Sequence, residues 1–160
     1  MTESEALLLQ VYSDLQAAEL VYVEADEATY CQAAAKYQQA AEKIVKAVCA
    51  SVEEKGKATF QNRYTHNLGA LFTVLTLPSL KPLDAVFDTS RQTQINSLMQ
   101  IAPTRSTTLR NTEYPFQGAA GEWQAPAAKG VFSKAEVTEY AFLSSQLLTA
   151  AKAALAELFP

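Results

Sequence analysis

The segment from Tyr30 to Val48 constrains the fold most, because it predicts a helix that is apolar over much of its surface. It lacks Gly and Pro and is rich in Ala, Gln, Glu and Lys, which are strong helix formers. Its small alanines allow neighbouring helices to approach closely, so the segment is expected to be the central helix of a bundle. The apolar stripe consists of three rows with a seven-residue repeat: Tyr30, Tyr37 and Ile44; Ala34, Ala41 and Val48; Ala33, Ala40 and Ala47. The polar remainder is Gln38, Gln39, Glu42, Lys43 and Lys46.

Periodic apolar residues predict helices in most of the remaining chain and no competing strand. Asp26 is expected to cap the central helix, which continues to about Lys55 and stops at Gly56. Ser133 and Glu136 form the sequence pattern of a capping box at the start of the last helix. We therefore expect an all-α, up-and-down bundle of about five helices in a single domain over residues 1–160. The other predicted helices are Ser4–Val23, Thr65–Leu75, Leu83–Ile101 and Ser133–Phe159.

A long segment rich in Pro, Gly and Ser, residues 103–132, precedes the last helix. Loops of this length are unusual in compact domains and often functional. Four aromatic side chains could tether it to the bundle: Tyr114, Phe116, Trp123 and Phe132.

The first residues and the cysteines both favour a cytoplasmic protein. The N-terminus is acidic where a secretory signal would be basic, and no apolar run approaches the ~20 residues that span a bilayer, so no membrane association is expected. Cys31 and Cys49 lie 18 positions apart on one predicted helix, roughly 27 Å. A disulfide requires Cα atoms within about 7 Å, so both are expected to be buried free thiols.

The charges are segregated along the chain. The formal net charge is −4, but residues 55–110 carry seven basic residues against Asp84 and Asp88, a local net charge of +5. These residues could be scattered over a solvated surface, or they could form a basic face toward a phosphate-bearing ligand. The basic residues are Lys55, Lys57, Arg63, Lys81, Arg91, Arg105 and Arg110.

The sequence lacks the residues that a metal site or a catalytic nucleophile would require. His66 is the sole histidine, and the two cysteines are too far apart to join it in a zinc site. No nucleophile elbow accompanies His66, and Gly118 to Gly121 lacks the spacing and lysine of a P-loop. We therefore expect no metal ligand, no cofactor and no catalytic residue.

The first two predicted helices contain Ser13 to Ala18 and Gln38 to Ala47, and Thr65 to Leu68 follows them. Together with three later segments, these residues resemble the HEPN family (higher eukaryotes and prokaryotes nucleotide-binding domain). Thr65-His-Asn-Leu68 is similar to the Thr-His-Asp-Leu start of the family's third helix, and the final Ser-capped helix also suits the pattern. Pro103-Thr-Arg105 and Arg110 to Pro115 both resemble the family's Pro-Thr-Arg-Tyr-Pro segment, here split by an insertion. The resemblance covers about Leu8 to Phe159.

The resemblance implies a helical bundle, commonly a homodimer, that belongs to a nucleotide or RNA system. Some members of the family are ribonucleases of toxin–antitoxin or defence systems, and others are non-catalytic partners of small nucleotidyltransferases. The ribonucleases carry Arg, four to six intervening residues, then His. Here no histidine follows Arg105 or Arg110, and Arg63 precedes His66 by only three positions. This departure favours a binding role over RNA cleavage.

Five residues are the candidate ligand contacts: Arg63, His66, Arg105, Arg110 and Tyr114. Arg105 or Arg110 could grip a phosphate while Tyr114 stacks on a base. Each also has a structural alternative. His66 could bond a backbone group or a carboxylate, and Arg110 could pair with Glu113 or a helix carbonyl.

Three functions stay open on these residues. The first is a dimeric HEPN-like protein that binds a nucleotide, RNA or a nucleotidyltransferase partner through the basic middle and residues 103–132. The second is a ribonuclease with a rearranged site that uses Arg63 and His66. The third is a helical module that binds only protein.

Overall fold

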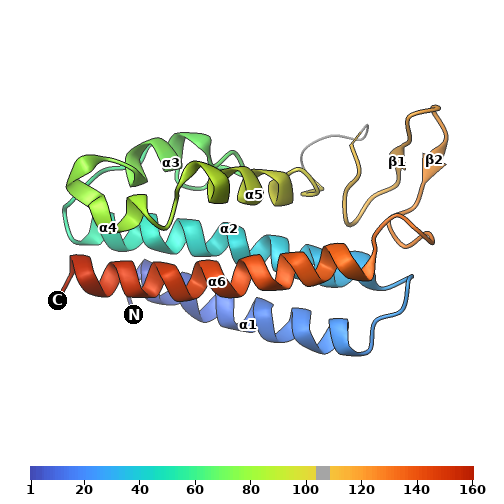
Figure 1. Ribbon diagram of the computed structural model, residues 1–160, viewed down its shortest axis with the longest axis horizontal. Helices are drawn as coiled ribbons and strands as arrows, with labels where there is room; N and C mark the ends of the chain where they lie inside the picture. The colour runs from blue at the N-terminus through green and yellow to red at the C-terminus, as the bar shows by residue number, and fades with distance from the viewer. Residues whose placement is uncertain (104–108) are drawn as a thin grey trace.

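Three long helices run side by side along the computed structural model, which describes residues 1–103 and 109–160 (Figure 1). They are α1 (Glu3–Val23), α2 (Tyr30–Glu54) and α6 (Lys134–Leu158). α1 runs antiparallel to α2, as the short connection between them requires, and α6 runs in the same direction as α2 (Figure 1). Both chain ends therefore lie at one end of the bundle. The predicted all-α class is confirmed.

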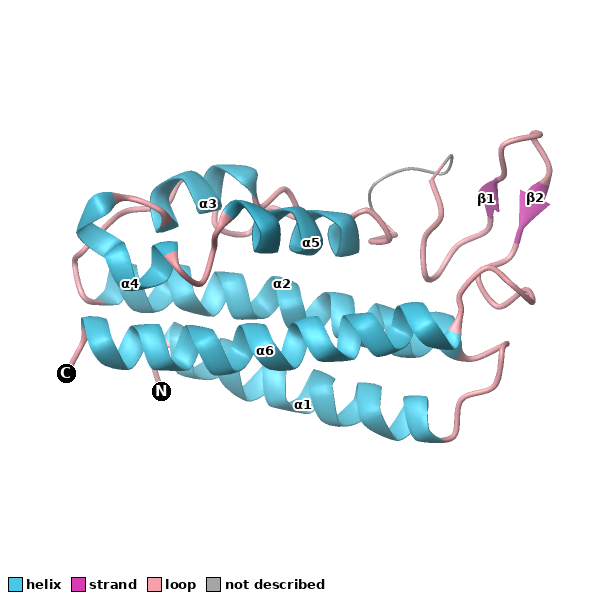
Figure 2. Ribbon diagram, in the orientation of Figure 1, coloured by secondary structure: helices cyan, strands magenta, loops and turns pink. Residues whose placement is uncertain are grey.

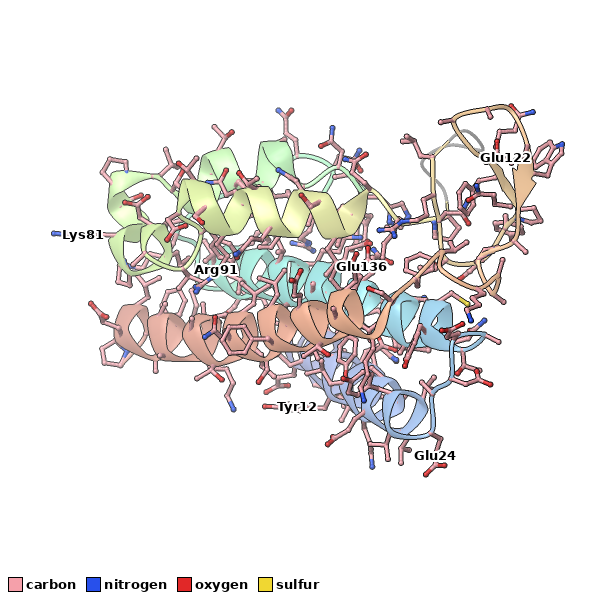
Figure 3. The ribbon with its side chains drawn as sticks, turned by 45° about the vertical axis from the view of Figure 1, so that its right-hand side comes forward. Tyr12, Glu24, Lys81, Arg91, Glu122 and Glu136 are labelled. Atoms are coloured by element: carbon pink, nitrogen blue, oxygen red, sulfur yellow. The ribbon has the colours of Figure 1, made fainter. Side chains whose placement is uncertain are left out.

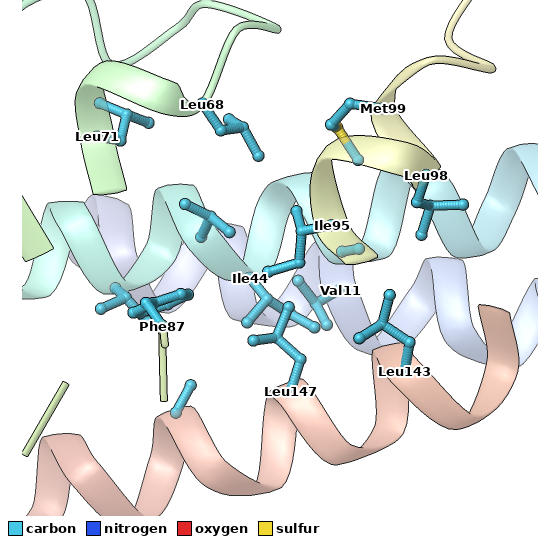
Figure 4. Close-up of a cluster of buried hydrophobic side chains, with 14 of the residues drawn as sticks. Val11, Ile44, Leu68, Leu71, Phe87, Ile95, Leu98, Met99, Leu143 and Leu147 are labelled. Carbon is cyan, nitrogen blue, oxygen red and sulfur yellow. The ribbon is translucent and has the colours of Figure 1, made fainter. Parts of the chain in front are cut away.

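Helix α2 is the centre of the bundle, as its alanine-rich stripe predicts. Sixteen of its 25 residues are buried, because α1, α5 and α6 pack around it. Val11 of α1, Ile44 of α2 and Leu147 of α6 are completely buried in one cluster (Figure 4). Ser144 of α6 also donates a buried hydrogen bond to the carbonyl oxygen of Tyr37 at 3.3 Å, which fixes α6 against α2.

Four short elements cover α2 and α6 and lie above them in the view of Figures 1 and 2, whereas α1 lies below. The predicted helix Leu83–Ile101 is wrong as a single element. Asp88 has an extended backbone, and its carboxylate accepts a hydrogen bond from the N–H of Arg91 at 2.8 Å, so it caps a new helix. The elements are α3 (Gly69–Leu75), the 3-10 turn η1 (Pro78–Leu80), α4 (Lys81–Asp84) and α5 (Thr89–Met99).

Two predicted helix starts are also wrong, for a shared reason. The predicted helix at Thr65 begins only at Gly69, because the Thr65 hydroxyl accepts a hydrogen bond from the N–H of Asn67 at 2.9 Å in a local turn. Asp26 likewise accepts from the N–H of Ala28 at 3.0 Å, within the turn that precedes α2. In both cases the side chain caps a turn before the helix instead of the helix itself.

The start of α6 and the end of α2 agree with the sequence. Ser133 accepts a hydrogen bond from the N–H of Glu136, and the Glu136 carboxylate accepts one from the N–H of Ser133, so the predicted capping box forms. Helix α2 ends at Glu54, and Gly56 follows with a φ of +64°, which a glycine adopts without strain.

The segment before α6 contains a short hairpin that the sequence did not predict. Strand β1 (Phe116–Gln117) pairs antiparallel with β2 (Trp123–Gln124), and the hairpin projects beyond the bundle (Figures 1 and 2). Phe116 and Phe132 are buried and tether the segment, as predicted. Trp123 and Tyr114 are instead exposed to 65% and 60%.

The cysteines occupy the predicted environment. Cys31 and Cys49 are both buried free thiols on α2. Burial raises the pKa of Cys49 to about 12, and it also raises the pKa of Cys31. Within residues 1–103 and 109–160, no helix combines the length and apolarity needed to cross a bilayer.

Candidate ligand-binding groove

A groove of about 400 Å³ lies along one side of α2, where the segments before α3 and after α5 approach it. We call it the α2 groove. Helix α2 supplies most of its polar wall, and α1 contributes one leucine. Its lining residues are Leu7, Gln38, Gln39, Glu42, Lys43, Lys46, Tyr64, His66, Ala102, Pro103 and Glu113.

The carboxylate of Glu42 is the shared hydrogen-bonding partner of three other side chains in the α2 groove. It accepts hydrogen bonds from Lys46 Nζ at 2.5 Å and from Gln38 Nε2 at 3.0 Å. The Nδ1 atom of His66 lies 3.0 Å from both of its oxygens. Helical spacing places Gln38, Glu42 and Lys46 four residues apart on one face of α2. The fold then brings His66 to that face from a distant part of the chain.

Glu42 is ionised in this environment. Burial alone would raise its pKa, but the hydrogen bonds from Lys46 and His66 and the positive charges of these groups outweigh burial, so the pKa lies below its ordinary value. A buried carboxylate that is held in its charged form is costly unless several donors satisfy it. Here three donors do so, and all three also line the groove.

A second ion pair joins α1 to the same wall. Lys43 contacts the buried carboxylate of Asp14, and Lys36 lies 3.7 Å from it. Asp14 of α1 thus pairs with Lys43 of α2 across the two helices. Lys46 instead pairs with Glu42 inside α2. Lys43 keeps about a quarter of its side chain exposed, so its ammonium group can reach a ligand in the α2 groove.

His66 combines the two roles considered from the sequence, a structural histidine and a side chain that faces a ligand. It bonds a carboxylate, as a structural histidine would, and half of its side chain is exposed on the groove wall. Arg63, its expected companion, is directed elsewhere: its guanidinium group forms ion pairs with Glu3 of α1 and Glu53 of α2. These pairs tie the segment before α3 to the bundle, so Arg63 and His66 do not form one site.

A second candidate arginine, Arg110, fastens the segment that contains the hairpin to α6. Arg110 donates to the carbonyl oxygen of Val131 and to the carboxylate of Glu136, both at 2.8 Å, and its guanidinium carbon lies 4.6 Å from the ring centre of Phe132. Its acidic partner is Glu136, which Figure 3 labels on α6, and not Glu113, which was one structural alternative named from the sequence.

The roles of Tyr114 and Arg105 as ligand contacts stay predictions. Tyr114 is exposed, and its neighbour Glu113 lines the α2 groove, but Tyr114 itself is not among the lining residues. Arg105 lies outside the described residues. Pro103, which belongs to the same sequence motif, does reach the groove.

Within the part of the middle segment that the structure describes, four of the basic side chains have separate surroundings. Arg63 and Arg110 are in ion pairs with different acidic partners, and Arg91 donates to the carbonyl oxygen of Val86 at 3.2 Å. Lys81 projects from one end of the molecule, opposite the end that carries Glu122 (Figure 3). Among the described residues, the lysines that line the α2 groove are Lys43 and Lys46 of α2, and His66 lines it beside them.

Sequence reasoning missed that Gln38 and Glu42 are buried. Both were assigned to the polar face of α2, yet they are 3% and 7% exposed. The available signal was their position beside the apolar rows, four residues apart, on a helix that is buried almost all round. Two polar residues at such positions need buried partners.

In comparisons with known proteins, no family model, no curated protein and no solved structure matches this chain. The HEPN resemblance therefore rests on the residues quoted above and remains a prediction. The fold and the groove define an all-α bundle with a polar, partly cationic groove beside its central helix.

Proposed function

We propose that this protein binds a phosphate-bearing ligand, a nucleotide or RNA, in the α2 groove and acts as a binding or accessory protein. The observation that carries the proposal is the convergence of Lys43, Lys46 and His66 on one groove in a chain whose net charge is −4. A volume of about 400 Å³ is in the usual range for small-ligand sites.

The buried carboxylates orient the cationic groups of the α2 groove. Asp14 and Glu42 are 4% and 9% exposed at their side chains. Asp14 is not among the lining residues and acts from behind the groove wall, whereas Glu42 is itself part of the wall. Each lysine ammonium has three N–H donors, and the ion pair uses only part of this capacity. A phosphate group that enters the groove would accept the remaining hydrogen bonds from ammonium groups that are already positioned.

The HEPN resemblance supports two further parts of the proposal, a homodimer and a small nucleotidyltransferase partner, as in a toxin–antitoxin-type system. The outer surface of α1 supports the homodimer, because large apolar side chains are exposed along it. Leu9, Leu20 and Val23 are exposed to 60%, 66% and 71%. A second copy could cover this surface without blocking the wall of α2.

The binding proposal is tested with a labelled single-stranded RNA of mixed sequence and a panel of nucleotides, by fluorescence anisotropy at two salt concentrations. Lys43→Gln is expected to weaken binding and to lower its salt dependence, whereas Lys43→Arg retains most of the affinity. Lys81→Gln is the matched control, because Lys81 is exposed at the end of the molecule (Figure 3). Absence of binding by the unmodified protein, or equal losses in Lys43→Gln and Lys81→Gln, would refute the proposal.

The contact between Glu42 and His66 favours ribonuclease activity as the second candidate function. A carboxylate 3.0 Å from Nδ1 orients a histidine ring for proton transfer, and half of His66 is exposed. In this alternative, His66→Ala abolishes cleavage of varied RNA substrates, while Lys81→Gln cleaves like the unmodified protein. If the unmodified protein leaves all substrates intact, this alternative is eliminated and the binding function stands.

A further inference from the structure

Tyr64 stands out on the rim of the α2 groove because its ring is exposed and yet held from several sides. Its exposed fraction is 71%, and it is one of the residues that line the groove. Its hydroxyl donates to the Glu3 carboxylate at 3.1 Å, and its carbonyl oxygen accepts a hydrogen bond from Lys46 Nζ at 3.4 Å. An exposed tyrosine on a turn would ordinarily sample several rotamers. These contacts restrict it.

Arg63 adds a rigid support for the ring. Its guanidinium carbon lies over the Tyr64 ring, 5.6 Å from the ring centre, a distance at which cation and ring attract each other. Arg63 is itself held by Glu3 and Glu53, and its side chain is only 15% exposed. Glu3 therefore contacts both Arg63 and Tyr64, and the three residues form a connected support.

We propose that Tyr64 is a stacking platform for the nucleobase of the ligand and that Glu3 and Arg63 are its positioning residues. This inference rests on the proposed function, because it assigns the base of a nucleotide whose phosphate contacts Lys43 and Lys46. A fixed, exposed aromatic ring offers its face to a base at little entropic cost. The hydrogen bond from Lys46 to the Tyr64 carbonyl places the Tyr64 backbone beside one of the two lysines that are assigned to the phosphate.

The test compares two probes that differ only in the base, adenosine 5′-monophosphate and ribose 5-phosphate, with binding measured by NMR titration. The unmodified protein is expected to bind the nucleotide about tenfold more tightly than the sugar phosphate. Tyr64→Leu removes that difference, so that both probes bind equally, whereas Tyr64→Phe keeps most of it. Ribose 5-phosphate is expected to bind Tyr64→Leu as it binds the unmodified protein.

Tyr12 provides a closely matched control. Its hydroxyl bonds to Lys152 at 3.0 Å, and the same ammonium group lies 5.7 Å from its ring centre, so it too is an exposed tyrosine anchored beside a cation. It does not line the α2 groove, and Tyr12→Leu is expected to leave both affinities unchanged.

The positioning role is tested with Glu3→Gln, which weakens the support of the ring but leaves the lysines in place. It is expected to reduce the affinity for the nucleotide a few-fold and to leave the affinity for ribose 5-phosphate unchanged. General destabilisation of the protein would lower both affinities. Equal affinity of the unmodified protein for both probes, or equal losses for both in Tyr64→Leu, would refute the stacking platform and leave the proposed function standing. If neither these probes nor RNA bind, the proposed function and the platform both fail.

Discussion

Replacing Glu42 with glutamine tests whether a buried negative charge organises the wall of the α2 groove. Glu42→Gln keeps the size of the side chain and one hydrogen-bond acceptor but removes the charge that holds Lys46 and His66. Hydrogen bonds to a charged group contribute about 1.5–3 kcal/mol each. Because half of His66 is exposed, water can replace part of its contact, so we expect a loss of about 2 kcal/mol in the free energy of unfolding.

The pH dependence of this loss has a defined sign. The pKa of Glu42 is lower in the folded protein than in the unfolded chain, where it is about 4.3. Its stabilisation is therefore fully present above pH ~4.3 and disappears as the pH falls through the lower, folded-state pKa. The stability difference between the unmodified protein and Glu42→Gln should be largest near neutral pH and shrink in acid.

Urea unfolding followed by circular dichroism, at several pH values between about 7 and 3.5, measures this difference. Glu157→Gln is the control, since Glu157 is exposed on α6 and its replacement should change stability by less than about 0.5 kcal/mol. Equal stability of Glu42→Gln and the unmodified protein at neutral pH would refute the reasoning. So would a difference that does not change with pH.

Three further predictions concern α6 and the thiols. Ser133→Ala should lower the free energy of unfolding by about 1 kcal/mol, because the capping box is lost, and an unchanged urea midpoint would contradict this role. Arg110→Ala should cost about 1–2 kcal/mol and increase hydrogen exchange around Val131, whereas exchange that stays protected there would show that Arg110 does not hold the segment. Cys49, whose pKa burial raises to about 12, should react with a thiol reagent near pH 8 only after unfolding, so rapid labelling of the folded protein would contradict its burial.

The long helices could be predicted from the sequence because each buries one periodic stripe. Helix α1 begins one residue before the predicted Ser4, α6 lies within a residue of its predicted bounds, and α2 ends one residue before the predicted Lys55. The failures fall at Asp26, Thr65 and Asp88, whose side chains can cap either a turn or a helix. Tertiary packing decides whether the side chain caps the turn or the helix, and the local sequence does not reveal that packing.

The α2 groove could be predicted only in part, because it joins residues from separate segments. The resemblance drew attention to His66 and to the segment that contains Pro103, and both line the groove. The contact of His66 with Glu42 spans 24 positions and depends on how the segment before α3 crosses α2. Arg63 was selected for its charge, but the carboxylates that bind it come from distant parts of the chain.

An amide chemical-shift map tests the central claim most directly. Isotope-labelled protein is titrated with adenosine 5′-monophosphate, and the shifts of backbone amides are followed residue by residue. The largest changes are expected to cluster at residues that line the α2 groove, namely Gln39, Lys43, Lys46, Tyr64 and His66. Changes confined to another surface, or none at millimolar nucleotide and none with short RNA, would contradict it.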